Sequence, residues 1–244
     1  MHVQKTSLEL PGERAAFLLL HGFTGLPDEM CGLAKFLNEK GFHVSVPLLA
    51  GHGTTPEDLA TTTWKDWENS ANEALIELEK LNIPIFIIGV CAGGLLAYTL
   101  ASKKQKIAGL VSMAAFYELP GYFKYIAPFF RVLNWHKFKP TFDKRMKPES
   151  LPFAYPVWPT PCITSARDLV FATKKILPTI KQPTLLVYSE RDRVAGLKHF
   201  KYVKKHLRNS PTCLLLQSAG HMVIKGSQKE KIFNEILSFV DDKI

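Results

Sequence analysis

The chain has 244 residues, of which 46% are apolar and 22% are charged, a composition that is ordinary for a globular protein and excludes a disordered or collagen-like chain. At this length we expect one large domain, or one domain with an inserted cap. The 31 basic residues exceed the 22 acidic ones, and the formal net charge of +9 raises the question of a nucleic-acid or anionic-membrane partner.

Short apolar runs recur along the chain and are continuous rather than alternating, which indicates strands that are buried on both faces of a parallel sheet. They are residues 16–20, 43–47, 85–89, 110–113, 184–188 and 213–217. Helical patterns lie between them, at residues 27–40, 64–81, 92–102, 196–207 and 227–240. This alternation predicts an α/β fold, with a mostly parallel sheet covered by helices on both faces.

The alternation breaks between Phe116 and Phe171. This segment contains 14 of the 27 aromatic residues of the chain, and prolines are frequent in its second half. We therefore predict a cap over residues 116–171, inserted into a core formed by residues 1–115 and 172–244. We expect most of its rings to hold the cap on the core and a few to line an apolar pocket.

The uncharged stretch Leu81–Ser102 is long enough to cross a bilayer. However, Pro84, Gly89 and the pair Gly93–Gly94 interrupt it, and they favour a strand, a tight turn and a buried helix. The N-terminus lacks the basic and apolar regions of a secretory signal. Because the four cysteines also show no disulfide framework, we expect a cytoplasmic protein with reduced thiols and no transmembrane segment.

The strongest chemical signal is Gly89-Val90-Cys91-Ala92-Gly93-Gly94, between a predicted strand and a predicted helix. A G-x-S-x-G sequence in that place forms a nucleophile elbow, and here cysteine occupies the position of the nucleophile. The N-terminus of a helix favours negative charge and therefore a thiolate. The alternative is a buried cysteine in a tight turn, since a bare G-x-C-x-G also occurs by chance.

Two further segments place reactive side chains at strand ends. Asp192 lies in the segment after the strand at 184–188, and His221 follows the strand at 213–217. Open α/β sheets bind their ligands at the carboxyl ends of the strands. The order Cys91, Asp192, His221 is that of a hydrolase triad. We predict that Asp192 orients His221, and that His221 takes the proton of Cys91 and later gives it to the leaving group.

An oxyanion hole is predicted from the segment Leu18–Gly25, which follows the first buried strand. Its glycines allow a backbone N–H to face the reacting carbonyl, and we assign the N–H groups of Phe23 and Ala92 as the two donors. We expect His21 and His52 to be structural, His52 within a tight turn near the mouth of the site.

No metal and no cofactor is expected, because the histidines lack metal-ligand spacing and no phosphate-binding glycine motif is present. The lysines fall on helix faces and helix ends, for example Lys198, Lys201 and Lys205, and no nucleic-acid motif accompanies them. We therefore expect a small-molecule partner rather than a nucleic acid, bound by a monomer or a homodimer.

The chain contains, in this order, the segments LLLHGFTG, GHGTTPEDL, GVCAGG, SERDRV and SAGH. With these segments it resembles bacterial carboxylesterases and monoacylglycerol lipases of the α/β-hydrolase superfamily. The resemblance extends from about Phe17 to Val240. It implies an α/β-hydrolase fold with a small cap, a triad of Cys91, Asp192 and His221, and hydrolysis of carboxylic esters with apolar acyl chains.

The chain departs from these esterases at Cys91, where they have serine. One alternative is therefore a cysteine-dependent lactone hydrolase, as in the dienelactone hydrolases, and another is an acyltransferase or a thioesterase. A further alternative is a weakened or inactive hydrolase that acts as a ligand-binding protein.

Overall fold

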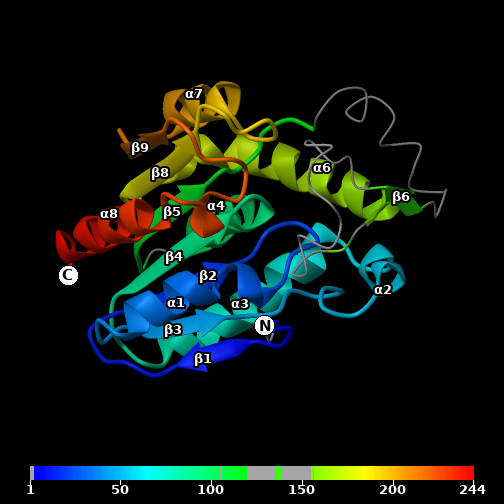
Figure 1. Ribbon diagram of the computed structural model, residues 1–244. Helices are drawn as coiled ribbons and strands as arrows, with labels where there is room; N and C mark the ends of the chain where they lie inside the picture. Colours follow the sequence, from blue (N-terminus) through cyan, green and yellow to red (C-terminus); the bar gives the residue numbers. More distant parts are fainter. Residues whose placement is uncertain (1–2, 105, 120–135, 139–154, 156) are drawn as a thin grey trace.

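A seven-stranded sheet forms the centre of the molecule, in the order β1-β3-β2-β4-β5-β8-β9 (Figure 1). The computed structural model describes residues 3–104, 106–119, 136–138, 155 and 157–244. The strands are β1 Leu8–Leu10, β2 Ala16–Leu20, β3 His43–Val46, β4 Ile85–Val90, β5 Ile107–Met113, β8 Thr184–Ser189 and β9 Thr212–Leu216. β1 runs antiparallel to β3, and all the other neighbouring strands of this sheet are parallel. The predicted α/β fold is confirmed.

Helices cover both faces of the sheet, which is why β2, β4 and β8 are buried along their whole length. On one face, in front in Figure 1, α1 (Cys31–Asn38) contacts α8 (Lys229–Asp241). On the other face α3 (Trp64–Glu79), α4 (Ala92–Lys103) and α6 (Thr160–Ile176) contact one another. α7 (Leu197–His206) packs against β8.

Some elements differ from the prediction. The helix expected at residues 27–40 is divided into a 3-10 turn, η1 (Pro27–Glu29), and α1. Pro27 is the first residue of η1, and proline is common at the first position of a helical turn because its φ is already fixed near the helical value. The sequence also gave no signal for β1, which has only three residues, or for the short helix α2 (Pro56–Ala60), which Thr55 caps by accepting the N–H of Asp58.

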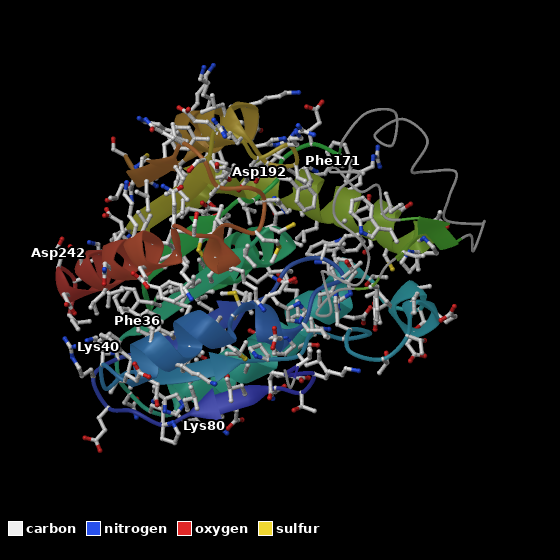
Figure 2. The ribbon with its side chains drawn as sticks, viewed as in Figure 1. Phe36, Lys40, Lys80, Phe171, Asp192 and Asp242 are labelled. Carbon is white, nitrogen blue, oxygen red and sulfur yellow. The ribbon has the colours of Figure 1, made fainter. Side chains whose placement is uncertain are left out.

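Most of the predicted cap lies outside the described residues, so its boundaries stay a prediction. In the part that is described, β6 (His136–Phe138) pairs antiparallel with β7 (Val157–Pro159). α6 then begins at Thr160, packs against α4 and continues to Ile176, so the predicted boundary at residue 171 falls inside a helix. Phe171, one of the aromatic residues of the predicted cap, lies on α6 and is 46% exposed (Figure 2).

The uncharged stretch at residues 81–102 forms β4, the turn at Cys91 and most of α4, as predicted. Gly89 and Cys91 separate its two apolar halves, so it is not one continuous helix. Within the described part of the chain, no helix combines the length and the apolar character that crossing a membrane requires.

Candidate active site

Cys91 occupies a sharp turn between β4 and α4. Its φ of 56° and ψ of −117° are unusual for a residue with a side chain, and such a conformation costs on the order of 1–3 kcal/mol. The N–H of Cys91 donates to the carbonyl oxygen of Met113 on β5 at 2.9 Å, which holds the turn against the neighbouring strand. The turn presents a half-buried Cys91 at the N-terminus of α4, where the sequence predicts it.

Two glycines make this turn possible, because the chain passes very close to itself. A Cβ added to Gly89 would lie 2.1 Å from the carbonyl oxygen of Gly93, and a Cβ added to Gly93 would lie 2.2 Å from that of Leu20. These neighbours are backbone atoms, which have little freedom to move aside. The glycines therefore bring β2, β4 and α4 together around Cys91.

His221 and Asp192 meet Cys91 from the loops that follow β9 and β8. The Nδ1–H of His221 donates to Oδ2 of Asp192 at 2.8 Å, and the side chain of His221 lies close enough to Cys91 to interact with it electrostatically. Oδ1 of Asp192 accepts the N–H groups of Val194 at 2.7 Å and Ala195 at 2.9 Å. The carboxylate of Asp192 is fully buried at the end of β8 (Figure 2). The structure thus brings together all three residues that the sequence predicts as a triad.

The charges of these groups depend on one another. Burial alone would lower the pKa of His221, but the negative charge of Cys91 and the hydrogen bond to Asp192 outweigh it and raise that pKa from 6.5 to about 10. Burial alone would raise the pKa of Asp192, but the hydrogen bond and charge of His221, with the two backbone donors, hold it below its ordinary value. A thiolate at position 91 therefore favours a protonated His221 beside an ionised Asp192.

The loop between β2 and η1 lies directly against the elbow. A Cβ added to Gly22 would lie 3.2 Å from the Cβ of Cys91. The N–H of Gly25 donates to the carbonyl oxygen of Gly22 at 3.0 Å, which curls the loop around Phe23. Ala92 is the first residue of α4, where N–H groups have no acceptor within the helix. The predicted oxyanion donors thus lie next to Cys91 in the chain and in the loop that touches it.

Glu29 holds this loop in place, although no sequence pattern singles it out as a site residue. The side chain is buried, and its Oε2 accepts the N–H of Gly22 at 2.7 Å. A Cβ added to Gly25 would lie 2.2 Å from Oε1 of Glu29, so the glycine leaves the space that the carboxylate fills. An acidic residue in the first turn of a predicted helix is ordinary, and the sequence therefore carried no signal for this contact.

Tyr155 was predicted only as one of the aromatic residues of the cap, but it joins two loops of the site. Its N–H donates to the carbonyl oxygen of Thr24 at 3.0 Å. Its hydroxyl donates to the carbonyl oxygen of Gly51 at 3.2 Å and accepts the N–H of Thr54 at 2.8 Å. Because Gly51 and Gly53 both have positive φ, the segment between them forms the expected tight turn. Tyr155 ties this turn to the loop between β2 and η1, residues 21–26, which is the predicted oxyanion loop.

His21 and His52 are buried beside the oxyanion loop, with ring centroids 4.9 Å apart. The Nδ1–H of His21 donates to the carbonyl oxygen of Gly22 at 3.1 Å, and its Nε2 accepts the N–H of Leu49 at 3.2 Å. Burial lowers the pKa of His21 to about 3 and that of His52 to about 4, so both rings are neutral at neutral pH. Through these contacts, both residues stabilise the conformation of the loop.

Comparison with sequence families and curated proteins gives a consistent result. A family model described as the alpha/beta hydrolase family matches residues 17–232. A thermostable monoacylglycerol lipase of Bacillus sp. (strain H-257) is 33% identical over 178 residues, which are 72% of this chain and 70% of the relative. A carboxylesterase of Bacillus subtilis (strain 168) is 24% identical over 237 residues, 94% of either chain.

Comparison with solved structures supports the same fold. A structure reported for LipS and LipT, two metagenome-derived lipolytic enzymes, is 26% identical, with a TM-score of 0.86 over 99% of this chain and 100% of the other. The monoacylglycerol lipase of Paleococcus ferrophilus, at 19% identity and a TM-score of 0.80 over the whole of both chains, supports the fold alone. On the family match, the relatives and the fold together, this chain belongs to the alpha/beta hydrolase family.

Proposed function

We propose that this protein hydrolyses carboxylic esters with apolar acyl chains through an acyl-enzyme on Cys91. The observation that carries the proposal is the grouping of Cys91 with His221, which is hydrogen-bonded to Asp192, at the carboxyl ends of three parallel strands. Family membership and the lipase and carboxylesterase relatives support ester hydrolysis as the reaction.

In the acylation step, the sulfur of Cys91 adds to the carbonyl carbon of the ester, and the electron pair of the C=O bond moves to oxygen. The N–H groups of Phe23 and Ala92 stabilise this oxyanion. The bond to the leaving group then breaks, and His221 gives its proton to the departing atom. The products of this step are the free alcohol or thiol and a thioester on Cys91.

In the second step, water cleaves the thioester. The sulfur no longer carries the negative charge that raises the pKa of His221, so the imidazole returns to its neutral form more readily. Neutral His221 takes a proton from the water, which adds to the acyl carbon, and the thiolate of Cys91 leaves. The acid is released, and the pair of Cys91 and His221 is restored.

Aromatic rings beside the oxyanion loop support an apolar acyl chain. The half-buried rings of Phe23 and Trp158 lie 5.6 Å apart, and the buried ring of Trp67 lies behind Phe23 at 5.8 Å. Each methylene of a substrate that becomes buried against such a surface contributes about 0.8 kcal/mol to binding. We therefore expect octanoyl esters to be cleaved with a higher kcat/KM than acetyl esters.

The test is to mix the protein with p-nitrophenyl octanoate, to measure the released p-nitrophenol, and to record the intact mass after rapid acid quenching. We expect turnover and an octanoyl adduct that peptide mapping places on Cys91. The matched control is Cys213→Ala, which removes a half-buried thiol at the start of β9 and should retain both adduct and turnover.

Cys91→Ala should form no adduct and lose turnover. An octanoyl adduct on another residue, or equal turnover by the Cys91→Ala variant, would refute the acyl-Cys91 route. If neither the protein nor its Cys91→Ser variant hydrolyses any acyl ester, the hydrolase function itself is wrong.

A further inference from the structure

We infer, on the basis of the proposed function, that His199 is a positioning residue for the triad. By accepting the N–H of Tyr117, it ties the loop that carries Asp192 to the segment that supports the turn of Cys91, and protonation of its ring opens this link. His199 lies outside the triad and acts on the reacting groups only through these two segments of backbone.

The first end of the link is the segment at residues 113–117, which leaves β5 directly beside the elbow. The carbonyl oxygen of Met113 accepts the N–H of Cys91 at 2.9 Å. A Cβ added to Gly94, in the first turn of α4, would lie 3.1 Å from the Cβ of Ala115. Because this segment touches both sides of the elbow, a shift of the segment changes the support of the turn at Cys91.

The second end of the link is the start of α7, which packs beside β8 (Figure 1). A Cβ added to Gly196, the residue before α7, would lie 2.5 Å from the carbonyl oxygen of Asp192. The carbonyl oxygen of Gly196 in turn accepts the N–H of His199 at 2.9 Å. The carboxylate of Asp192 is itself bound by the N–H groups of Val194 and Ala195. The loop of Asp192 and the first turn of α7 therefore move as one unit.

His199 joins the two ends by a hydrogen bond between its ring and the backbone. Its Nδ1 accepts the N–H of Tyr117 at 2.9 Å, so the neutral ring carries its proton on Nε2. The ring of Tyr117 also lies 5.4 Å from that of Tyr202 on α7, and Lys198 forms an ion pair with Glu118. Side-chain contacts of this kind tolerate small shifts, whereas a hydrogen bond to a backbone N–H fixes the position of the chain itself.

The link depends on the charge of the imidazole. Protonated histidine has a hydrogen on both ring nitrogens and accepts no hydrogen bond. The N–H of the buried Tyr117 would then face a donor instead of an acceptor, which is unfavourable for a group without access to water. Protonation of His199 therefore separates the start of α7 from the segment at residues 113–117.

Burial is the largest factor that acts on the pKa of His199, and it lowers this pKa below 6.5. Charged groups from four segments of the described chain add to it: the two lysines lower the pKa further, and the two carboxylates oppose them. These groups are Lys198 on α7, Lys174 on α6, Glu118 after β5 and Asp192 after β8. The ring is therefore neutral above pH 6.5, and the link opens as the pH falls below this value.

The test compares the wild type with His199→Asn, whose Oδ1 can accept the N–H of Tyr117 and does not titrate. The ratio of the two kcat values for p-nitrophenyl octanoate is measured between about pH 5 and pH 8. Titration of Cys91 and His221 is common to both proteins and cancels in this ratio. We expect a ratio near one at the upper limit and a fall of about tenfold as His199 becomes protonated, with little difference in KM.

Two further variants frame this result. His199→Phe keeps an aromatic ring without an acceptor, and its kcat should be about tenfold low at every pH with KM retained. The matched control is His43→Asn at the start of β3, the opposite end of the sheet from the site, and it should follow the wild-type profile. If His199→Phe does not fold, the ratio of the wild type to His199→Asn decides the question alone.

A second measurement needs no activity. In an NMR titration, the imidazole of His221 should respond to the protonation of His199 in the wild type, and this response should be absent in His199→Asn. A ratio near one throughout the titration of His199, or a normal kcat in a folded His199→Phe, would overturn this inference and leave the proposed function standing. If the wild type cleaves no ester, the proposed function is wrong, and the titration of His221 still decides whether His199 positions the triad.

Discussion

The protonation of His221 is governed by its contacts with two side chains. Its raised pKa of about 10 arises from Cys91 and Asp192 acting against burial. A histidine whose pKa is raised on folding contributes stability that is complete below its ordinary value of 6.5 and is lost as the pH rises toward 10. The lowered pKa of Asp192 acts in the opposite sense, and its contribution is lost as the pH falls below the ordinary 3.8. Both contributions are complete between these two values.

We predict that Cys91→Ser lowers the pKa of His221, because the negative charge of Cys91 is the largest of the factors that raise it. The measurement is an NMR titration of the imidazole of His221 in both proteins. Cys213→Ser, which alters a thiol on β9, should leave the titration unchanged. An unchanged pKa in Cys91→Ser would mean that Cys91 carries no charge next to His221.

Glu29 gives a second prediction, because it holds the predicted oxyanion loop through the N–H of Gly22. Glu29→Ala leaves the buried N–H of Gly22 without its acceptor, and we expect kcat to fall about tenfold to a hundredfold with little change in KM. Glu29→Gln keeps an acceptor oxygen and should recover most of the lost kcat.

Kinetic constants for a p-nitrophenyl ester, with melting temperatures of both variants, check this prediction. A fall in the melting temperature with kcat intact would instead make Glu29 a purely structural residue. A KM that rises while kcat is retained would place the side chain in substrate binding.

At the scale of elements, the close approach of β2, β4 and α4 is the most demanding feature of the fold. We predict that Gly93→Ala destabilises the protein by about 1–3 kcal/mol, because the new methyl group would lie 2.2 Å from the carbonyl oxygen of Leu20. The control is Gly32→Ala in α1, where the nearest atom outside the helix would be a ring atom of Phe233, 3.7 Å from the new methyl group, and where a helix prefers alanine.

Chemical denaturation of the two variants gives the free energies of unfolding. Gly32→Ala should be as stable as the wild type or more stable. If Gly93→Ala proves equally stable, the elbow has room to relax and the tight contact does not limit this fold.

The elements could be predicted where burial leaves an apolar pattern in the sequence. In β4, β8 and α4 the apolar runs are continuous, because neighbouring elements cover these segments on both faces. The positions of Cys91, Asp192 and His221 also followed, because parallel strands end at one edge of a sheet. β1 could not be predicted, since its three residues carry no period. Glu29 and Tyr155 were missed as site residues because their roles consist of hydrogen bonds to backbone atoms of distant loops, which no local pattern encodes.

At the scale of the whole molecule, the candidate site exists only where several strand ends meet. β2 leads into the predicted oxyanion loop, β4 into the turn of Cys91, β8 into the loop of Asp192 and β9 into the loop of His221. β4 and β9 are not neighbours in the sheet, since β5 and β8 lie between them (Figure 1). Any disturbance of the sheet edge at β9 therefore reaches the environment of Cys91 through His221.

This dependence on β9 has a consequence for how the protein is made. A ribosome completes Cys91 long before it reaches His221, which follows the last strand of the sheet. Because domains fold as units, the proposed triad of Cys91, Asp192 and His221 is incomplete on the nascent chain until β9 adds to the sheet. If Cys91 is the nucleophile that we propose, the complete site therefore forms only after the last strand of the sheet is in place.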